Sequence, residues 1–164
     1  MAKTLYLMRH AKSSWSDMNL DDFDRPLNER GFRDAPDMGK RLAKQKVCPD
    51  LLLSSPARRA RETAGIIAGE LGLPESMPAY DENIYAASCG ELLQIVRSIP
   101  DEHESAMLIG HNPAMEQLVN LLADMRIESM PTCAVATLAL NIDDWTQADR
   151  ATGRLLDFDY PKKS

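Results

Sequence analysis

Short apolar runs alternate along the chain with longer stretches in which apolar residues recur every three or four positions. The short runs predict buried strands over residues 4–8, 50–54 and 105–109, because each run is brief and is followed at once by polar or turn residues. Two more strands are expected near the end of the sequence, over residues 133–140 and 153–160. The pattern therefore predicts five strands, with helices between the earlier ones.

The longer stretches carry signals that predict where helices begin and end. Asn28 is expected to cap the first helix, with Glu29 in its first turn, where a negative charge suits the helix dipole. Pro56 is favourable at the first position of the second helix, and Gly72 is expected to close it. A third helix is expected to stop at Pro100, and a fourth follows the third strand with an apolar stripe at helical spacing.

Strands that alternate with helices predict an α/β fold. Parallel neighbours need crossover connections, and helices in these connections cover both faces of the sheet. We therefore expect a three-layer α/β/α sandwich with a mostly parallel central sheet. The 164 residues suit one domain spanning residues 1–164. In such sheets, ligands bind beyond the carboxyl ends of the strands.

Histidine and arginine residues follow three of the predicted strands. Arg9 and His10 come directly after the first strand, Arg59 lies shortly after the second, and His111 follows the third. The chain contains three histidines, and two of them fall at these strand ends, whereas His103 is expected to be an ordinary loop residue. The strand ends should therefore deliver these side chains to one edge of the sheet.

This set of side chains suits phosphoryl transfer. A transferring phosphoryl group spreads its charge over three oxygens and needs fixed cationic donors, and arginine pairs two oxygens at once without losing its charge. A neutral imidazole can attack phosphorus and form a covalent intermediate, which divides one difficult step into two. Two arginines and two histidines therefore form a coherent site that needs no metal, and no cofactor is expected.

Composition and charge argue against several other classes. The formal net charge of -6 and the pI near 5.1 argue against a nucleic-acid-binding protein and against attachment to anionic membranes. No signal peptide or membrane span is expected, so a cytoplasmic location is predicted. Cys48, Cys89 and Cys133 are scattered, which predicts reduced, mostly buried thiols rather than a zinc cluster or a disulfide framework. The histidines also lack the i, i+4 spacing of many metallohydrolases, which disfavours that class.

Four segments of the sequence together resemble a known family. Residues 7–12, Leu-Met-Arg-His-Ala-Lys, resemble the Arg-His-Gly signature of the histidine phosphatase superfamily, the phosphoglycerate mutase-like enzymes. Residues 24–31 are similar to the family's Arg-Pro-Leu-Thr-x-x-Gly segment, and residues 54–64 to its Ser-Pro-x-x-Arg-Ala-x-x-Thr segment. Residues 108–112, Leu-Ile-Gly-His-Asn, resemble its second-histidine motif. The four segments follow the family's order and spacing over nearly the whole chain.

The resemblance implies a role for each residue at the strand ends. His10 would be the nucleophile that becomes phosphorylated, while Arg9, Arg59 and His111 would line the phosphate pocket and hold the transferring oxygens. The family arginine stands directly before an alanine, which selects Arg59 over its neighbour Arg58. The fold implied by the resemblance is phosphoglycerate mutase-like.

Two more site residues are implied by their places in the family pattern, and one arginine is left open. The family's acid lies in a turn before the second histidine, so Glu82 is the candidate that protonates the leaving group and activates water. Ser16, six residues after His10, matches a polar phosphate contact. Arg25 either serves the site or pairs with one of the loop aspartates.

Departures from the family pattern narrow the expected function. Ala11 replaces the signature glycine, as in the short branch of the superfamily that includes phosphohistidine phosphatases, and Lys12 stands where the mutases carry an acidic residue. The 28 residues from position 83 to position 110, between Glu82 and His111, leave no room for the lid insertions of mutases and fructose bisphosphatases. The site should therefore be open, and an open site can admit a phosphorylated protein side chain.

Three functions remain in competition at this point. The leading prediction is a metal-independent protein phosphohistidine phosphatase that forms a covalent phosphohistidine intermediate. The first alternative is a small-molecule phosphomonoesterase with the same chemistry, and a basic or apolar rim around the site would discriminate between the two. The second alternative is a non-catalytic phosphate-binding module, which the intact set of arginines and histidines disfavours. The expected partner is accordingly a phosphorylated protein or a small phosphate ester, and the oligomeric state is left open.

Overall fold

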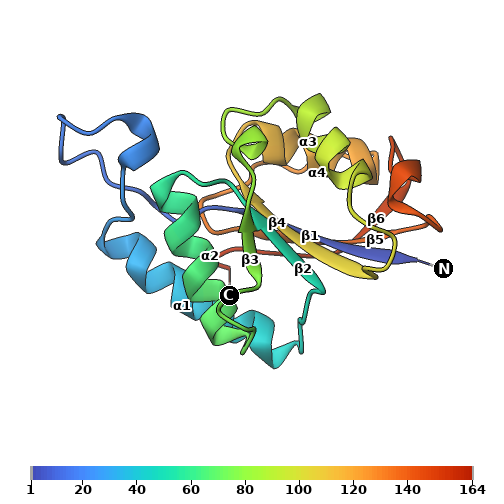
Figure 1. The fold of residues 1–164 in the computed structure, drawn as a ribbon, viewed down its shortest axis with the longest axis horizontal. Helices are drawn as coiled ribbons and strands as arrows, with labels where there is room; N and C mark the ends of the chain where they lie inside the picture. Colours follow the sequence, from blue (N-terminus) through green and yellow to red (C-terminus); the bar gives the residue numbers. More distant parts are fainter. Residues whose placement is uncertain (1, 164) are drawn as a thin grey trace.

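The computed structural model describes residues 2–163, whose strands form one six-stranded sheet (Figure 1). The strands are β1 (Lys3–Arg9), β2 (Leu51–Ser54), β3 (Pro78–Tyr80), β4 (Ser105–Gly110), β5 (Val135–Leu140) and β6 (Gly153–Asp159). Their order across the sheet is β3-β2-β4-β1-β5-β6. The first four of these run parallel to one another, while β5 is antiparallel to both β1 and β6. The expectation of a mostly parallel sheet is confirmed.

In the described part of the chain, two pairs of helices cover the two faces of this sheet (Figure 1). α1 (Glu29–Lys44) and α2 (Arg58–Glu70) pack on one face, and α3 (Cys89–Arg97) and α4 (Ala114–Ala123) pack on the other. Short 3-10 helices lie in the connections: η1 (Asp22–Asp24), η2 (Glu82–Ile84) and η3 (Trp145–Gln147). The arrangement is the three-layer sandwich that the sequence pattern predicts.

The sheet is buried on both faces because successive side chains of its central strands point to opposite sides. On β1, Leu5 and Leu7 belong to the core under α3 and α4, while Met8 belongs to the core under α1 and α2. On β4, Leu108 belongs to the core under α3 and α4, and Ile109 belongs to the core under α1 and α2. A slip of one residue would exchange the two sets, so this burial fixes the register of β1 against β4.

The structure differs from the expected strands in two places. β3 has no counterpart in the sequence pattern, because it has only three residues, begins with Pro78 and lies at the edge of the sheet. β5 begins at Val135 rather than Cys133, because Cys133 has a left-handed backbone (φ 65°) and its N–H donates to the carbonyls of Arg9 and His10. The turn at Cys133 therefore packs directly against the end of β1.

One helix boundary follows its capping signal and another departs from it. Asn28 caps α1 as expected, because its side chain accepts a hydrogen bond from the N–H of Gly31 at 2.9 Å. Pro56, expected at the first position of the second helix, lies outside it. α2 begins at Arg58, since the backbone of the preceding residue Ala57 is still extended (ψ 139°).

The three cysteines differ in exposure. Cys48 is exposed, Cys89 is half-buried and Cys133 is buried, and all three thiols are free. The expectation of mostly buried thiols is therefore wrong for Cys48, which lies in the connection between α1 and β2 rather than in a helix or strand facing the core.

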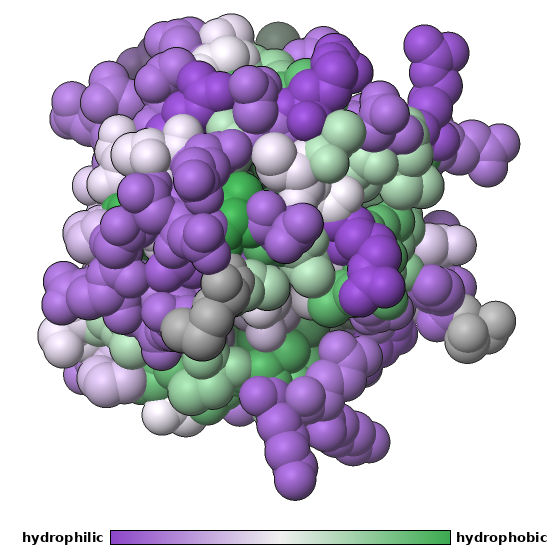
Figure 2. Space-filling view, turned by 90° about the vertical axis from the view of Figure 1, so that its right-hand side faces the viewer, coloured by the Kyte–Doolittle hydropathy of each residue, from purple (hydrophilic) through white to green (hydrophobic). Residues whose placement is uncertain are grey.

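Polar side chains dominate one end of the molecule. Figure 2 shows this end, the right-hand side of Figure 1: hydrophilic residues (purple) cover most of it, and apolar residues (green) show in smaller patches between them. Within residues 2–163, no helix is long and apolar enough to cross a lipid bilayer.

At the opposite end, residues 13–28 form a projecting loop that joins β1 to α1 and carries η1 (blue, at the left of Figure 1). A bridge between Ser13 and Leu27 closes the base of this loop. The N–H of Asn28 also donates to the carbonyl of Lys12 at 3.0 Å. The base of the projecting loop is therefore held against the first turn of α1.

We predict opposite effects for two glycine-to-alanine substitutions in helices. At Gly31 an added methyl carbon would lie 2.2 Å from the carbonyl oxygen of Lys12, so Gly31→Ala should lower the unfolding free energy by about 1–3 kcal/mol. At Gly65 nothing lies within 4 Å of that position, so Gly65→Ala should raise it by about 0.5–1 kcal/mol through helix propensity. Urea unfolding followed by circular dichroism measures both, and equal effects would contradict the close contact at Gly31.

Candidate active site

The ends of β1, β2 and β4 meet at one edge of the sheet. Parallel pairing puts the N–H of His10 3.1 Å from the carbonyl oxygen of Gly110, at the end of β4. On the other side of β4, the N–H of Ser55 donates to the carbonyl of Ile109 at 3.0 Å. The ring centroids of His10 and His111 are consequently only 5.1 Å apart.

His10 is buried, and one hydrogen bond fixes its ring. Nδ1 of His10 lies 2.7 Å from the carbonyl oxygen of Ala11, which can only accept, so Nδ1 carries the proton and Nε2 carries the lone pair. Burial, together with the nearby side chains of His111 and Arg59, lowers the pKa of His10 to about 3. His10 is therefore a neutral imidazole near pH 7, with Nε2 available to attack phosphorus.

Thr63 ties the turn at the nucleophile to α2. Its hydroxyl accepts a hydrogen bond from the N–H of Ala11 at 3.0 Å and donates to the carbonyl of Arg59 at 2.8 Å. Ala11 stands where the family signature has glycine, and its methyl group is fully buried in the core under α1 and α2. The alanine is therefore accommodated with the backbone bonds of this turn in place.

Arg9 and Arg59 each present a buried N–H donor with no partner among the described residues. Nη1 of Arg9 donates to the carbonyl of Met130 at 3.1 Å, and both terminal nitrogens of Arg59 donate to Asp22, but the Nε of each arginine is unbonded. A buried donor without a partner is costly, and an anion that accepts from it removes that cost. The two guanidinium groups are therefore suited to phosphoryl oxygens.

His111 is oriented by two polar contacts. Its Nδ1 lies 3.5 Å from Nη2 of Arg59, which can only donate, and its Nε2 lies 2.8 Å from the hydroxyl oxygen of Ser55. In this orientation Nδ1 accepts and Nε2 donates. Burial, and after it the charge of Arg59, lowers the pKa of His111 to about 4. Both histidines are therefore neutral near pH 7, which leaves the arginines as the cationic donors.

Glu82 and Ser16 are not bonded to the arginines and histidines at the strand ends. Glu82 lies on η2 with an exposed side chain, and no hydrogen bond or ion pair joins its carboxyl group to another described residue. Ser16 lies exposed on the projecting loop, where its hydroxyl oxygen is 2.7 Å from that of Ser14. Their roles stay predictions, because catalytic contacts often form only when substrate is bound.

Arg25, whose role the sequence leaves open, is paired with a loop aspartate. Its Nε lies 3.1 Å from Oδ1 of Asp22, and its Nη1 donates to the hydroxyl of Ser13 at 2.9 Å. The guanidinium carbon is 3.4 Å from the centre of the Trp15 ring, which stacks on it from the solvent side. Arg25 therefore joins the exposed part of the projecting loop to the side chain that contacts Arg59.

The sequence does not predict three polar residues that contact Arg59 or His111 in the structure: Asp22, Tyr85 and Ser55. The Tyr85 hydroxyl donates to Asp22 Oδ2 at 2.7 Å, and the Tyr85 ring lies edge-on to that of His111 at 5.6 Å. Asp22 is one of three aspartates within residues 21–24, so spacing does not single it out. Ser55 does belong to a family segment, and its place next to a strand end is a signal that could have found it.

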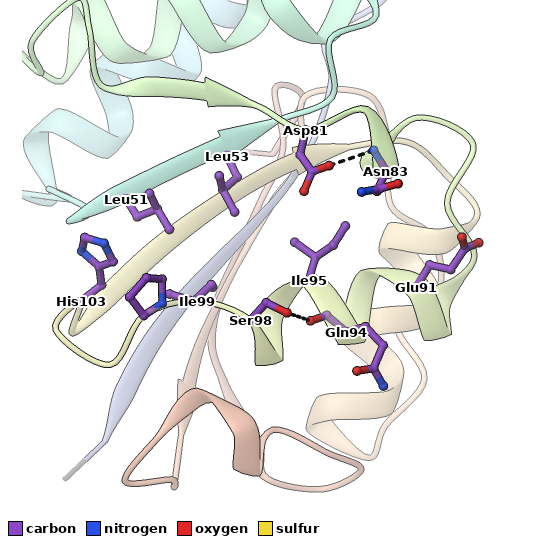
Figure 3. Close-up of a pocket in the computed structure, with 11 residues that line it drawn as sticks. Leu51, Leu53, Asp81, Asn83, Glu91, Gln94, Ile95, Ser98, Ile99 and His103 are labelled. Atoms are coloured by element: carbon purple, nitrogen blue, oxygen red, sulfur yellow. Dashed lines mark hydrogen bonds between the residues drawn. The ribbon is translucent and has the colours of Figure 1, made fainter.

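A separate cavity of about 540 Å³ lies between β2 and α3 (Figure 3). Leu51 and Leu53 of β2 face Ile95 and Ile99 across it, and polar side chains such as Asp81 stand at its rim. None of the phosphate-binding candidates lines this cavity. The site at the strand ends is therefore distinct from it.

The group at the strand ends contains several donors that suit an anion. Within residues 2–163, no group of three or more histidine, cysteine, aspartate or glutamate side chains lies in position to hold a metal ion. The helices α2 and α4 follow β2 and β4 and begin at the same edge, where helix N-termini favour negative charge. The arrangement can therefore bind a phosphoryl group against a neutral imidazole.

Known proteins are similar to this chain in sequence and in fold. The family model of the histidine phosphatase superfamily (branch 1) matches residues 5–83. An uncharacterised chloroplastic protein of Arabidopsis thaliana is 31% identical over 161 residues, which cover 93% of this chain and 73% of the relative. SixA of Agrobacterium tumefaciens, assigned as a phosphohistidine phosphatase, is 31% identical and superposes with a TM-score of 0.83 over 97% of this chain and 98% of its own. The chain belongs to the histidine phosphatase superfamily.

The family model covers only part of the site of this histidine phosphatase. Residues 5–83 include Arg9, His10 and Arg59, whereas His111 lies beyond the matched range and joins them through the pairing of β4 with β1. The structural likeness to SixA extends over both parts. The expected phosphoglycerate mutase-like fold is confirmed, and the family and this neighbour support a phosphatase.

The buried neutral histidines predict that the protein loses stability in mild acid. Histidine in the unfolded chain has a pKa near 6.5, whereas His10 and His111 have values of about 3 and about 4 in the fold, so the unfolded state binds more protons between these limits. The contribution of the two histidines to the unfolding free energy should be fully present above about pH 6.5. Below that pH the unfolding free energy should fall by up to about 1.4 kcal/mol per pH unit for each histidine.

Urea unfolding between about pH 7 and pH 5 measures this slope. His10→Asn with His111→Asn should flatten it, because the two groups that gain protons on unfolding are gone. His103→Asn is the matched control, since His103 lies in a loop outside the site, and it should keep the slope of the wild type. An equally steep slope in the double variant would contradict the assignment.

Proposed function

We propose that this histidine phosphatase hydrolyses phosphohistidine in proteins by transferring the phosphoryl group to Nε2 of His10. The observation that carries the proposal is a buried, neutral His10 whose lone pair lies on Nε2, together with two buried arginine N–H donors that have no partner among the described residues. Arg9 and Arg59 would hold the phosphoryl oxygens, and His111 would donate from Nε2, the ring nitrogen that carries the proton.

Two displacements at phosphorus complete the reaction. The substrate's imidazole ring takes up one proton from solvent on its free nitrogen, and Nε2 of His10 attacks phosphorus while the bond to the ring's other nitrogen breaks, so that neutral imidazole leaves. A water molecule then attacks the phosphorus of phosphorylated His10, the P–Nε2 bond breaks, and inorganic phosphate leaves with release of a proton. Neutral His10 is regenerated, so the sum is hydrolysis of one phosphoramidate bond.

The leaving group supports phosphohistidine over an alkyl ester. Departure of an alkoxide needs a proton from a positioned acid at the bridging oxygen. A phosphohistidine ring can instead take up a proton from solvent on its free nitrogen and then leave as neutral imidazole, whose conjugate acid has an unperturbed pKa near 6.5. In the described residues, no carboxyl group is hydrogen-bonded to His10 or His111, and the predicted acid Glu82 is exposed. A site with this arrangement suits a leaving group of low basicity.

The rim of the site supports a protein substrate. Trp15 and Met18, both on the projecting loop, are 72% and 94% exposed, more than any other large apolar side chain in the described residues. Trp15 rests on Arg25, which is bonded to Asp22, the residue that contacts Arg59. An exposed aromatic ring that is tied to a binding site by such contacts offers apolar surface to a protein partner. The rim is therefore apolar on this side, which favours a phosphoprotein over a small ester.

Parallel turnover of a phosphohistidine protein, an aryl phosphate and an alkyl phosphate tests the proposal. We expect the phosphoprotein to have the highest kcat/KM, by about tenfold or more over the aryl ester, and the alkyl ester the lowest. His10→Ala should lower turnover of all three by at least about a thousandfold, because the nucleophile is gone. The wild type should keep its activity in EDTA and lose it to vanadate.

The outcomes separate the parts of the proposal. Comparable or better kcat/KM on small esters would overturn the phosphoprotein substrate while leaving the chemistry of His10 intact. Substantial activity of the His10→Ala protein would overturn the covalent mechanism. Loss of activity in EDTA, restored by a divalent metal, would overturn its independence of metals.

Replacement of Trp15 tests the role of the projecting loop in substrate choice. Trp15→Ala should lower kcat/KM for the phosphoprotein about tenfold more than for the aryl phosphate, because only the protein is large enough to reach the exposed indole. Leu156→Ala is the matched control, because Leu156 is 52% exposed on β6, an outermost strand of the sheet. Its replacement should leave the ratio of kcat/KM for the phosphoprotein to that for the aryl phosphate unchanged. An equal loss on both substrates would mean that Trp15 only supports the site.

A further inference from the structure

Asp22 makes a dense set of contacts at the candidate active site. Its carboxylate oxygen Oδ2 accepts from Nη2 of Arg59 at 3.0 Å and from the Tyr85 hydroxyl at 2.7 Å, and Oδ1 accepts from Nε of Arg25 at 3.1 Å. Its backbone carbonyl accepts from Nη1 of Arg59 at 2.6 Å. One residue of the projecting loop thus binds both terminal nitrogens of an arginine proposed to bind phosphate.

These contacts occupy terminal nitrogens of Arg59 that an oxyanion would also use. A guanidinium group holds two oxygens through two parallel N–H bonds, and Asp22 already takes one bond from each terminal nitrogen. The Nε of Arg59 is buried and unbonded. Nη2 of Arg59 donates to Oδ2 of Asp22 and also lies 3.5 Å from Nδ1 of His111, so a phosphoryl oxygen that bonds to Nη2 must compete with the carboxylate.

The carboxylate of Asp22 is charged and within reach of solvent. Although its partial burial acts in the opposite direction, hydrogen bonds from Tyr85 and Arg59 lower the pKa of Asp22 to about 2. Its side chain is 47% exposed, whereas that of Arg59 is 7% exposed. An ion pair exposed on one side is weak enough for a competing anion to displace. The contact can therefore open and close while Arg59 stays in place.

We propose that Asp22 is a specificity-determining residue that competes with phosphoryl oxygens for Arg59 and so disfavours free phosphate and small phosphate esters. A small anion must displace the carboxylate with the binding energy of its phosphoryl group alone. A phosphoprotein has additional contacts with the projecting loop, the element that carries Asp22, and these offset the displacement. This inference rests on the proposed phosphate site and concerns how that site selects its substrates.

Binding of inorganic phosphate and orthovanadate to Asp22→Asn tests the competition. The amide has nearly the same shape and still accepts from Tyr85, but it lacks the charge that attracts Arg59. We expect inhibition constants of both anions against an aryl phosphate to fall about tenfold, since a charged hydrogen-bond partner is replaced by a neutral one. The KM for the aryl phosphate should fall with them.

Asp24→Asn is the matched control for the loss of one negative charge. Asp24 lies on the same 3-10 turn, is exposed, and has no side-chain bond to Arg59 or to another described residue. Its replacement should leave the inhibition constants within about twofold, because exposed charges that make no contact are screened. A tenfold change in Asp24→Asn as well would mean that net charge, not competition for Arg59, controls anion binding.

Asp22→Glu and Asp22→Ser make the test independent of one variant's folding. The glutamate restores a carboxylate and should return anion binding toward the weak affinity of the wild type, whereas the serine should bind anions tightly. Anion affinity that is unchanged or weaker in Asp22→Asn and Asp22→Ser would overturn the proposal and assign Asp22 to holding Arg59 in its productive position. Failure of the wild type to bind phosphate or vanadate at all would instead overturn the proposed phosphate site.

The ratio of kcat/KM for the phosphoprotein to that for the aryl ester supplies a second readout. In Asp22→Asn this ratio should fall about tenfold, because the small ester gains access and the protein already had it. A purely structural role would lower both values together and leave the ratio where it was. A ratio that stays constant in a folded variant would therefore contradict the selective role.

Discussion

The hydrogen bond from the N–H of His10 to the carbonyl of Gly110, at 3.1 Å, joins the ends of β1 and β4. Because the two strands run parallel, the residues that follow them leave the sheet together, and His10 and His111 face each other at 5.1 Å. The register that allows this bond is fixed along the two strands, by side chains that alternate between two buried cores. The geometry of the site thus depends on the packing of the whole sheet.

Burial at this edge has two opposite electrostatic effects. It keeps His10 and His111 neutral, which is the form of imidazole that attacks phosphorus, whereas the arginines stay charged because a guanidinium group does not lose its proton. Positive charge is therefore concentrated where water is scarce, and it needs a counter-anion. In the free protein Asp22 supplies that anion to Arg59, and a phosphoryl group would supply it during the reaction. The burial that prepares the nucleophile thus also creates the competition for the arginine.

The parts of this site that the sequence predicts are those fixed by local pattern. Arg9, His10 and His111 follow short apolar runs, and the rule that ligands bind at strand ends brings them together before any contact is known. The contacts of Asp22 span 37 residues to Arg59 and 63 residues to Tyr85, and neither has a periodic signal, so they become visible only in the folded chain. β3 is hidden for a related reason, because three residues at a sheet edge are placed by their neighbour β2 rather than by their own pattern.

The charge of the whole molecule bears on how such a site can select its substrate. With a net charge of -6, the protein offers an approaching phosphate no general attraction, and at physiological ionic strength fields beyond about 8–10 Å are screened in any case. Selection must therefore come from contacts at short range. Arg59 lies at the site, Asp22 contacts it, and Arg25 connects Asp22 to the exposed Trp15 ring. A partner that binds Trp15 is thereby connected, through the side chains of Trp15, Arg25 and Asp22, with the arginine that its phosphoryl group needs.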